Sequence, residues 1–390
     1  MKKKLFVLFL TLFSTAANAG FETRAKSAFL VDYDSGTEIV AKNADVLMPP
    51  SSMIKLMTLT LLFDEIKAGR LNMDSRITVG ENADYNKPEW HPASKICLVA
   101  GQTISVRDLI LGLIVLSGGD ASVVVAEKIA GTENDFTKLM QDKARSIGME
   151  MSTFGNASGL PNPNNLATSR ELAILGRYII SEYPDIYPMF ATKRFEFKEH
   201  KTDWCREWGR THTVNYNKLL FNMNGADGMK TGHTDDGGYG MVASANVGGR
   251  RLIGVINGFH GKGHDALAAE MKKLIEYGYA TTINKVFYRP GDIVTEIPVW
   301  YGRKPTVNAT IDKTFAITVD KKTGLKNIRV LARFDEPISA PINQGDIIGE
   351  IIAEQSGQVL ARAPLVAKER VGKTMLFGRL IKNIKVIFGI

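Results

Sequence analysis

The chain has 390 residues, enough for more than one domain, and a formal net charge of +8 at pH 7. The charge is concentrated at the ends, with three lysines at Lys2–Lys4 and four basic residues without an acid in the last twenty. The body between them is nearly neutral and has no basic stripe interleaved with aromatic residues, which argues against a nucleic-acid partner.

The first nineteen residues have the pattern of a secretory signal peptide, residues 1–19. The lysines precede an apolar run, Leu5–Phe13, and small residues at Ala17–Ala19 offer a cleavage site before Gly20. The apolar run is too short for a convincing transmembrane helix. We therefore expect cleavage and a mature protein that works outside the cytoplasm; an uncleaved anchor is the alternative.

The next segments alternate between extended and helical patterns. Residues 28–33 and 37–41, separated by an Asp-Ser-Gly turn, are typical of a β-hairpin. A helix should begin near Ser51 or Ser52 and end at Ala68, directly before a glycine. Because this helix is apolar on nearly every side, we expect it to be buried within a domain.

Two more helices are predicted at 106–116 and 121–130, broken at Ser117-Gly118-Gly119. Asp120 is in a position to cap the second of them. Residues 134–182 have a mostly helical pattern around a polar loop.

From Asp227 the pattern changes to strands and then returns to helix. The strands are expected at 228–234, 239–246 and 251–259, and the helix at 264–280. Glycine-rich turns between the strands indicate an antiparallel meander. Helices before and after a late antiparallel sheet predict an α/β or α+β domain, with the sheet flanked by helices.

A composition break near Pro290-Gly291 opens a region of short alternating strands. They are expected at 293–299, 306–311, 315–319, 328–334 and 347–353. This pattern predicts a small all-β domain. We therefore divide the mature chain into a larger domain over residues 20–284, an all-β domain over 285–370 and a tail over 371–390.

Ser52 and Lys55 lie three residues apart at the start of the buried helix, so they share a face. A serine hydroxyl is a weak nucleophile until a base takes its proton, and lysine is such a base only when neutral. Burial and a second cation, for which Lys230 is the candidate, would both lower its pKa. An ordinary serine and an exposed lysine are the alternative, although an unpaired lysine among apolar residues is costly.

Ser117, between two helices, could relay a proton or simply belong to a turn. Lys230, Thr231 and Gly232 fall in a predicted strand. The lysine and threonine could bind the carboxylate of a peptide end, and the glycine would let a substrate backbone approach. The backbone N–H of His233 would be an oxyanion donor, opposite one at the helix start.

Two other residue pairs carry less information. His260 and His264 have glycines beside them and no glutamate between them, so we expect no metal site and no cofactor. Cys97 and Cys205 could form a disulfide in an oxidising compartment, but sequence alone does not show whether they do.

The motifs Ser52-Met53-Ile54-Lys55, Ser117-Gly118-Gly119 and Lys230-Thr231-Gly232 resemble those of class A β-lactamases and penicillin-binding proteins. Over almost the whole mature chain, notably in Leu116–Ala121 and Asp227–Asp235, the sequence resembles the serine-type D-alanyl-D-alanine carboxypeptidases, which are low-molecular-weight penicillin-binding proteins. The resemblance implies a β-lactamase/transpeptidase-like catalytic domain, a small all-β domain and an amphipathic tail helix.

The resemblance also implies a role for each motif residue. Ser52 would be acylated, Lys55 would be the general base, Ser117 would shuttle protons, and Lys230, Thr231, Gly232 and His233 would line the carboxylate and oxyanion pocket. The implied reaction removes the terminal D-alanine from peptidoglycan stem pentapeptides, without a cofactor. Penicillins and other β-lactams would acylate the same serine and inhibit the enzyme.

The second motif departs from the family pattern, because position 119 is glycine where the family usually has asparagine. The missing amide would hold a substrate carbonyl and a lysine; Asp120 could replace it after a local shift. A weakly active or inactive peptide-binding homologue is therefore one alternative. A β-lactamase is another, but no E-x-x-L-N run lies between Ser117 and Lys230, so we expect slow loss of the penicilloyl group.

Residues 371–390 project as an amphipathic helix, with Arg379, Lys382 and Lys385 opposite an apolar face. Basic residues spread through the segment suit the membrane interface better than a span. We expect a periplasmic protein attached peripherally to the outer face of the inner membrane through this segment. A helix packed on the β domain is the alternative.

Overall fold

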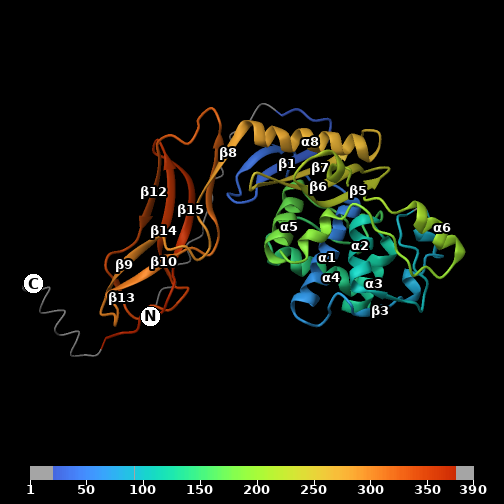
Figure 1. Ribbon diagram of the computed structural model, residues 1–390, viewed down its shortest axis with the longest axis horizontal. Helices are drawn as coiled ribbons and strands as arrows, with labels where there is room; N and C mark the ends of the chain where they lie inside the picture. The colour runs from blue at the N-terminus through green and yellow to red at the C-terminus, as the bar shows by residue number, and fades with distance from the viewer. Residues whose placement is uncertain (1–20, 92, 375–390) are drawn as a thin grey trace, which may run out of the picture.

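The computed structural model describes residues 21–91 and 93–374, so the expected signal peptide and most of the expected tail helix lie outside the described residues. The described chain forms a larger lobe, in which helices surround a sheet, and a smaller lobe made of strands (Figure 1). This is a mixed α/β fold with a C-terminal all-β domain, as the sequence pattern predicts.

The larger lobe holds the helices and the first seven strands. Its helices are α1 (Lys55–Lys67), α2 (Val106–Val115), α3 (Gly119–Ala130), α4 (Glu133–Ser146), α5 (Ser169–Glu182), α6 (Asp203–Thr211), α7 (Leu219–Asn222) and α8 (Gly263–Thr281). Its strands are β1 (Ser27–Asp32), β2 (Glu38–Lys42), β3 (Arg76–Thr78), β4 (Thr103–Ser105), β5 (Ala226–Thr234), β6 (Gly238–Val247) and β7 (Arg250–Phe259). Short 3₁₀ helices are η1 (Ser51–Ile54), η2 (Glu81–Ala83), η3 (Pro88–Trp90) and η4 (Tyr187–Ala191).

The predicted hairpin and the predicted meander join in one antiparallel sheet with the order β2-β1-β7-β6-β5. Alternate residues of β1 enter two different cores, Phe29 and Val31 on one face and Ala28 and Leu30 on the other. Helix α8 covers the second face, while α1 and α5 lie on the first (Figure 1). Each sheet face is therefore buried, which confirms the prediction of a sheet flanked by helices.

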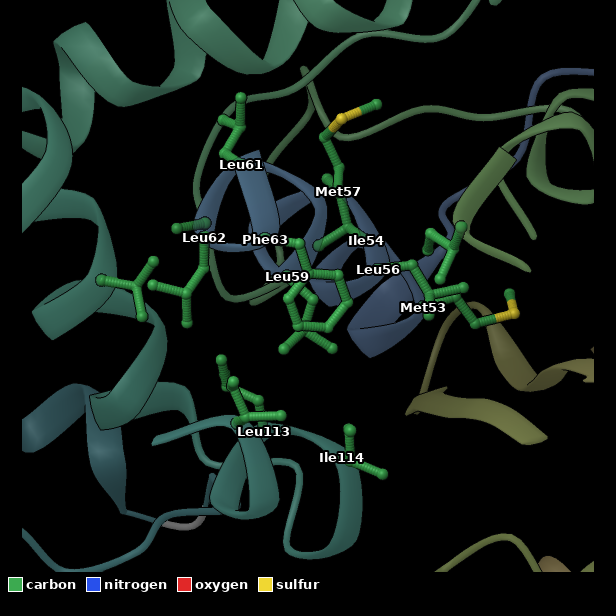
Figure 2. Packing of buried hydrophobic residues seen from close by; sticks show 14 of the residues in the cluster. Met53, Ile54, Leu56, Met57, Leu59, Leu61, Leu62, Phe63, Leu113 and Ile114 are labelled. Carbon is green, nitrogen blue, oxygen red and sulfur yellow. The ribbon is translucent and has the colours of Figure 1, made fainter. Parts of the chain in front are cut away.

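Helix α1 is buried over its first nine residues, as its apolar sequence predicts. Every residue from Lys55 to Phe63 is buried, and Leu113 and Ile114 of α2 face it across the core (Figure 2). The helix begins later than expected, because Ser51–Ile54 forms a 3₁₀ turn first. A 3₁₀ turn is a common start to an α-helix, and this one places Ser52 just before the first α-helical turn.

Asp120 does not cap α3, so that expectation is wrong. The helix begins at Gly119 with Gly118 as its N-cap, so Asp120 lies within the first turn, where its carboxylate accepts the Ala121 N–H at 2.9 Å. The loop in the predicted helical region 134–182 is also longer than expected, because no regular element lies between α4 and α5.

Helix α6 was not predicted, although Trp204, Cys205 and Trp208 recur at helical spacing in a short and otherwise polar sequence. Its start has a local cause, because the Thr202 hydroxyl accepts a hydrogen bond from the Cys205 N–H at 3.2 Å.

The smaller lobe contains the predicted strands and others that were missed. The strands are β8 (Thr282–Tyr288), β9 (Thr295–Trp300), β10 (Thr306–Thr310), β11 (Phe315–Asp320), β12 (Ile328–Arg333), β13 (Ile338–Ser339), β14 (Ile347–Gln355) and β15 (Gln358–Ala367). The sequence pattern missed β8, which follows α8 directly and pairs with β11, and β15, which pairs with β14.

The end of the described chain corrects the expected start of the tail helix. Val371 pairs with Ile342, and Lys373 pairs with Gly302, so both residues belong to the β domain. Val371 is buried in its core. Among residues 21–91 and 93–374, no helix is long and apolar enough to cross a membrane.

Substitution of Phe63 tests how much the stability of the larger lobe depends on the core around α1. Its side chain is fully buried, with its ring centroid 5.3 Å from Tyr183 and 6.2 Å from Phe190. We expect Phe63→Ala to lower the free energy of unfolding by about 3–5 kcal/mol, because it removes buried apolar surface and leaves a cavity. Denaturant unfolding measures this. Ile347→Ala, at a side chain 72% exposed, should change it by less than about 0.5 kcal/mol, and equal effects would contradict the prediction.

Candidate active site

The three sequence motifs meet at one cavity of about 610 Å³ between η1, the α2–α3 turn and β5. The cavity is lined by Ser52, Glu89, Ala93, Ser94, Ser117, Leu160, Pro161, Tyr216, Thr231, Gly232, His233, Thr234, Asp235 and His264. Lys55 and Lys230 do not line it; they are buried behind the two serines, to which they bond. The structure thus gathers all seven predicted site residues around one space.

Lys55 is placed to act on Ser52. Its Nζ atom donates a hydrogen bond to the Ser52 hydroxyl at 2.9 Å, and a second to the Ser158 carbonyl. The lysine is 2% exposed. Burial lowers its pKa from 10.5 to about 7, against an opposing effect of the buried Asp120 carboxylate. At neutral pH a large fraction of Lys55 is therefore uncharged and able to accept a proton.

Ser117 and Lys230 form a second pair across the cavity. Lys230 Nζ donates to the Ser117 hydroxyl at 2.9 Å and to the Thr231 carbonyl at 2.8 Å. Burial, and next the charge of Lys55, lower the pKa of Lys230 well below its usual value. Ser117 has a φ of +57°, a conformation that is costly for a residue with a side chain. This geometry aims the hydroxyl at the same space as Ser52.

Gly232 is also required by the protein itself, in addition to the expected approach of a substrate backbone. A Cβ atom at this position would lie 2.9 Å from the Pro50 carbonyl oxygen and 3.0 Å from the Ser52 nitrogen. The glycine therefore lets η1 pack directly on β5, which brings the backbone of Ser52 beside that of His233. The His233 side chain is exposed and packs on Tyr239, with ring centroids 4.0 Å apart.

The segment 156–160 contributes to the site and was missed. Two successive carbonyls hold α1: that of Ala157 accepts from the Thr58 hydroxyl at 2.7 Å, and that of Ser158 accepts from Lys55. A Cβ at Gly159 would lie 2.2 Å from the Ser51 carbonyl oxygen, so this glycine packs tightly against η1. Backbone carbonyls leave no residue-type signal, and the sequence showed only a polar loop here.

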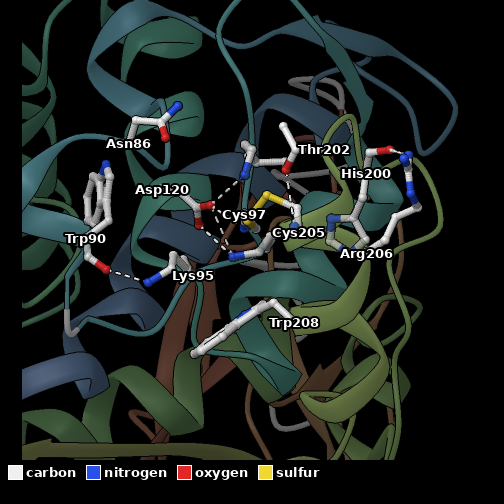
Figure 3. The surroundings of a disulfide bond; sticks show 12 residues. Asn86, Trp90, Lys95, Cys97, Asp120, His200, Thr202, Cys205, Arg206 and Trp208 are labelled. Carbon is white, nitrogen blue, oxygen red and sulfur yellow. Dashed lines mark hydrogen bonds between the residues drawn. A yellow bond between two sulfur atoms is a disulfide. The ribbon is translucent and has the colours of Figure 1, made fainter.

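Asp120 points away from the cavity, so it does not replace a side-chain amide at position 119. Its fully buried carboxylate accepts hydrogen bonds from the backbone N–H groups of Ile96, Cys97 and Leu98 (Figure 3). Burial raises its pKa, and these N–H groups oppose that shift. The carboxylate therefore ties the chain before α2 to the first turn of α3.

Cys97 and Cys205, left unassigned from sequence, form a disulfide with their Cα atoms 5.7 Å apart. The bond joins the segment that Asp120 holds to helix α6 (Figure 3). It lies behind the α2–α3 turn and takes no part in the cavity lining.

His264 also lines the cavity, although the sequence considered it only for a metal. Its ring lies 5.1 Å from Tyr216 and 5.3 Å from Tyr239, measured between centroids. Burial, and next the charge of Lys230, lower its pKa to about 4, so it is neutral at pH 7. Within the described part of the chain, no group of three or more His, Cys, Asp or Glu residues could hold a metal ion.

A serine bonded to a buried lysine of lowered pKa, beside a second serine–lysine pair, is the arrangement of a serine acyl-transfer enzyme. The model of the D-alanyl-D-alanine carboxypeptidase family matches residues 13–260, and that of the C-terminal domain of penicillin-binding protein 5 matches residues 284–373. The chain belongs to the D-alanyl-D-alanine carboxypeptidase family, whose members are hydrolases.

Relatives and solved structures agree with this assignment. The chain is 32% identical over 381 residues to D-alanyl-D-alanine carboxypeptidase DacC of Escherichia coli, covering 95% of this chain and 92% of that protein. It is 33% identical over 362 residues to DacA of Haemophilus influenzae, covering 91% and 87%. The structure of penicillin-binding protein 5 from Haemophilus influenzae covers 91% of this chain and 99% of its own, with a TM-score of 0.79 and 31% identity.

The ionisation of Lys55 is directly measurable. With ¹³C-labelled lysine, we expect NMR to show a lysine that titrates with a midpoint of about 7 and is absent from Lys55→Met. Because the folded pKa lies below the unfolded one, this group should make stability rise between about pH 7 and 10.5, and Lys55→Met should remove that rise. Titration of Lys55 near 10.5 would contradict the analysis.

Proposed function

We propose that the protein is a serine DD-carboxypeptidase that removes the terminal D-alanine from peptidoglycan stem pentapeptides through an acyl-enzyme on Ser52. The observation that carries the proposal is the 2.9 Å hydrogen bond between Ser52 and Lys55, a lysine whose pKa burial lowers to about 7. A serine needs such a base to become a nucleophile at neutral pH.

In the first step, Lys55 takes the proton of the Ser52 hydroxyl as its oxygen attacks the carbonyl of the penultimate D-alanine. The backbone N–H groups of Ser52 and His233 would stabilise the resulting oxyanion, since Gly232 allows the two backbones to approach. Lys230 and Thr231 would bind the substrate's terminal carboxylate.

Collapse of the oxyanion breaks the peptide bond and forms the ester on Ser52. The proton that Lys55 took from Ser52 passes by way of the Ser117 hydroxyl, which is bonded to Lys230, to the leaving D-alanine nitrogen, so Lys55 is neutral again. Water then attacks the ester with Lys55 again as the base, and the shortened peptide and free Ser52 are restored. The sequence of steps needs no metal or organic cofactor.

Penicillin should acylate Ser52 and stay attached, because a β-lactam resembles the peptide end and its product does not diffuse away. A solved structure similar to this chain, penicillin-binding protein D2 of Listeria monocytogenes, is in an ampicillin-bound form, at 26% identity and a TM-score of 0.56. Neither alternative, a β-lactamase or an inactive peptide-binding protein, has an observation that favours it over the carboxypeptidase.

D-Alanine release tests the enzyme. We expect the wild type to release D-alanine from a stem pentapeptide and Ser52→Ala to release it at least about a thousandfold more slowly, since the nucleophile is lost. Ser181→Ala, at an exposed serine on α5, is the matched control and should match the wild type.

Intact-mass measurement after penicillin addition should show an adduct on wild type and control alone. Background release from all three proteins would refute the carboxypeptidase, and rapid penicillin hydrolysis without an adduct would favour a β-lactamase.

We also propose that residues 1–19 direct export to the periplasm, that residues 20–284 carry the chemistry and that residues 285–370 form a separate domain. The tail would attach the protein peripherally to the outer face of the inner membrane. The charge pattern supports this, since Arg379, Lys382 and Lys385 lie in a segment otherwise almost entirely apolar.

Truncation tests the membrane attachment. The cut belongs after Thr374, because Val371 is buried in the β domain and its loss would damage that domain. We expect the truncated protein to lose binding to vesicles containing anionic lipid, while D-alanine release in solution is unchanged. Replacing Arg379, Lys382 and Lys385 by glutamine should weaken binding to anionic vesicles selectively, because each cation contributes about 1 kcal/mol near anionic lipid. Vesicle binding unchanged by truncation would refute the anchor.

A further inference from the structure

The space that a side chain at position 119 would need is occupied by the side chain of Trp90. A Cβ atom built on Gly119 would lie 2.6 Å from Cζ3 and 3.1 Å from Cε3 of the Trp90 ring. It would also lie 3.3 Å from the Ser94 carbonyl oxygen. Real Cβ atoms do not approach other atoms as closely as 2.6 Å, so no side chain fits at position 119 while the indole keeps its place.

The indole is buried, and the backbone that carries it is held by several contacts. Trp90 is 2% exposed, and its carbonyl accepts a hydrogen bond from Lys95 Nζ at 2.6 Å (Figure 3). Lys95 in turn lies over the rings of Trp204 and Trp208 on α6. The Ser94 carbonyl accepts the Gly119 N–H at 2.8 Å. The backbone on both sides of Gly119 is therefore held in place, and the indole, whose buried Nε1 atom has no hydrogen-bond partner among the described residues, is confined by packing alone.

Trp90 also lies where two parts of the site meet. It lines a cavity of about 310 Å³ together with Ser158 and Leu160. The Ser158 carbonyl holds Lys55, and Gly119 lies two residues after Ser117. The Trp90 ring thus packs against the turn that carries Ser117, the proposed proton shuttle. It also borders a cavity beside the segment that holds Lys55, the proposed base.

We propose that Trp90 and Gly119 act as one steric unit, in which the indole takes the space of a side chain at position 119 and holds the Ser117–Gly119 turn in its working position. Trp90 is thus a positioning residue, which acts through Gly119 and Ser117 without touching the substrate. This role rests on the proposed function. The packing itself does not, and the two are tested separately.

The consequence is that a change at position 119 depends on what stands at position 90. An asparagine at 119 would supply an amide, but beside Trp90 it would push the ring or the turn away. The same asparagine would fit once the ring is removed. A contact between neighbours of this kind makes the two substitutions non-additive, which a double-mutant cycle measures.

The experiment compares the full-length wild type with Gly119→Asn, Trp90→Ala, Trp90→Phe and the double variant Trp90→Ala/Gly119→Asn. Each is measured for its melting temperature and for its rate of acylation by a fluorescent penicillin. Gly248→Asn is the control, because a Cβ there meets nothing within 4 Å and asparagine tolerates its positive φ.

We expect Gly119→Asn to melt roughly 5 °C lower than the wild type, as overpacking requires, and to be acylated at least about tenfold more slowly, because a displaced turn misplaces Ser117. The double variant should recover part of both properties, in that its losses should be smaller than the losses of Gly119→Asn and Trp90→Ala combined. Trp90→Phe should keep most of the acylation rate, Trp90→Ala should lose it, and Gly248→Asn should behave as the wild type.

Two results would overturn the proposal. One is a Gly119→Asn variant that melts and is acylated like the wild type. The other is a double variant whose losses in both measurements equal the losses of the two single variants combined. If the wild type itself is not acylated, the proposed function fails, and the melting temperatures still decide whether Trp90 and Gly119 are coupled. Recovery of the melting temperature without the acylation rate would refute the positioning role and leave a purely structural contact.

Discussion

The site depends on one constraint, the burial of a lysine amine that has few charged neighbours. Lys55 has a serine hydroxyl and a backbone carbonyl as its hydrogen-bond partners, and the carboxylate that acts on its pKa, Asp120, is occupied by four backbone N–H groups. A closer carboxylate would keep the amine charged, and water would do the same. Water is kept away from the amine by its surroundings. These are the apolar helix α1, the packed carbonyls of residues 157–158 and the sheet behind them.

The fold provides this environment by bringing together short segments with exact spacing. Gly232 and Gly159 each occupy a place where another residue's backbone lies too close for a side chain. They clamp η1 between β5 and the 156–160 segment, so the start of α1 has little freedom. Because η1 is packed between rigid elements, Ser52 is held in one position. A group held in this way loses little entropy when it reacts.

Much of this was predictable from sequence, because the signals were local. The apolar run of α1, the glycine-bounded strands of the meander and the short motifs predicted the sheet, the buried helix and the seven residues around the cavity. What could not be predicted depends on long-range packing. The roles of the Ser158 carbonyl, of Asp120 and of Trp90 depend on tertiary contacts between backbone atoms and rings. Residue type alone does not predict those contacts. Helix α6 was missed although Trp204, Cys205 and Trp208 recur at helical spacing, because the apolar signal spans little more than one turn; the disulfide that fixes its place depends on a long-range pairing.

Because of that disulfide, the completed site depends on the cellular compartment in which the chain folds. Such bonds persist in oxidising compartments and are rare where thiols are kept reduced. The Cys97–Cys205 bond closes a loop that contains α2, α3, α4 and α5 and fastens the segment following Trp90 to α6. A chain that folds before meeting an oxidant would keep the Asp120 hydrogen bonds to residues 96–98 but would lack the covalent link from that segment to α6. Closing that link would be a second, chemical stage of maturation, later than folding itself.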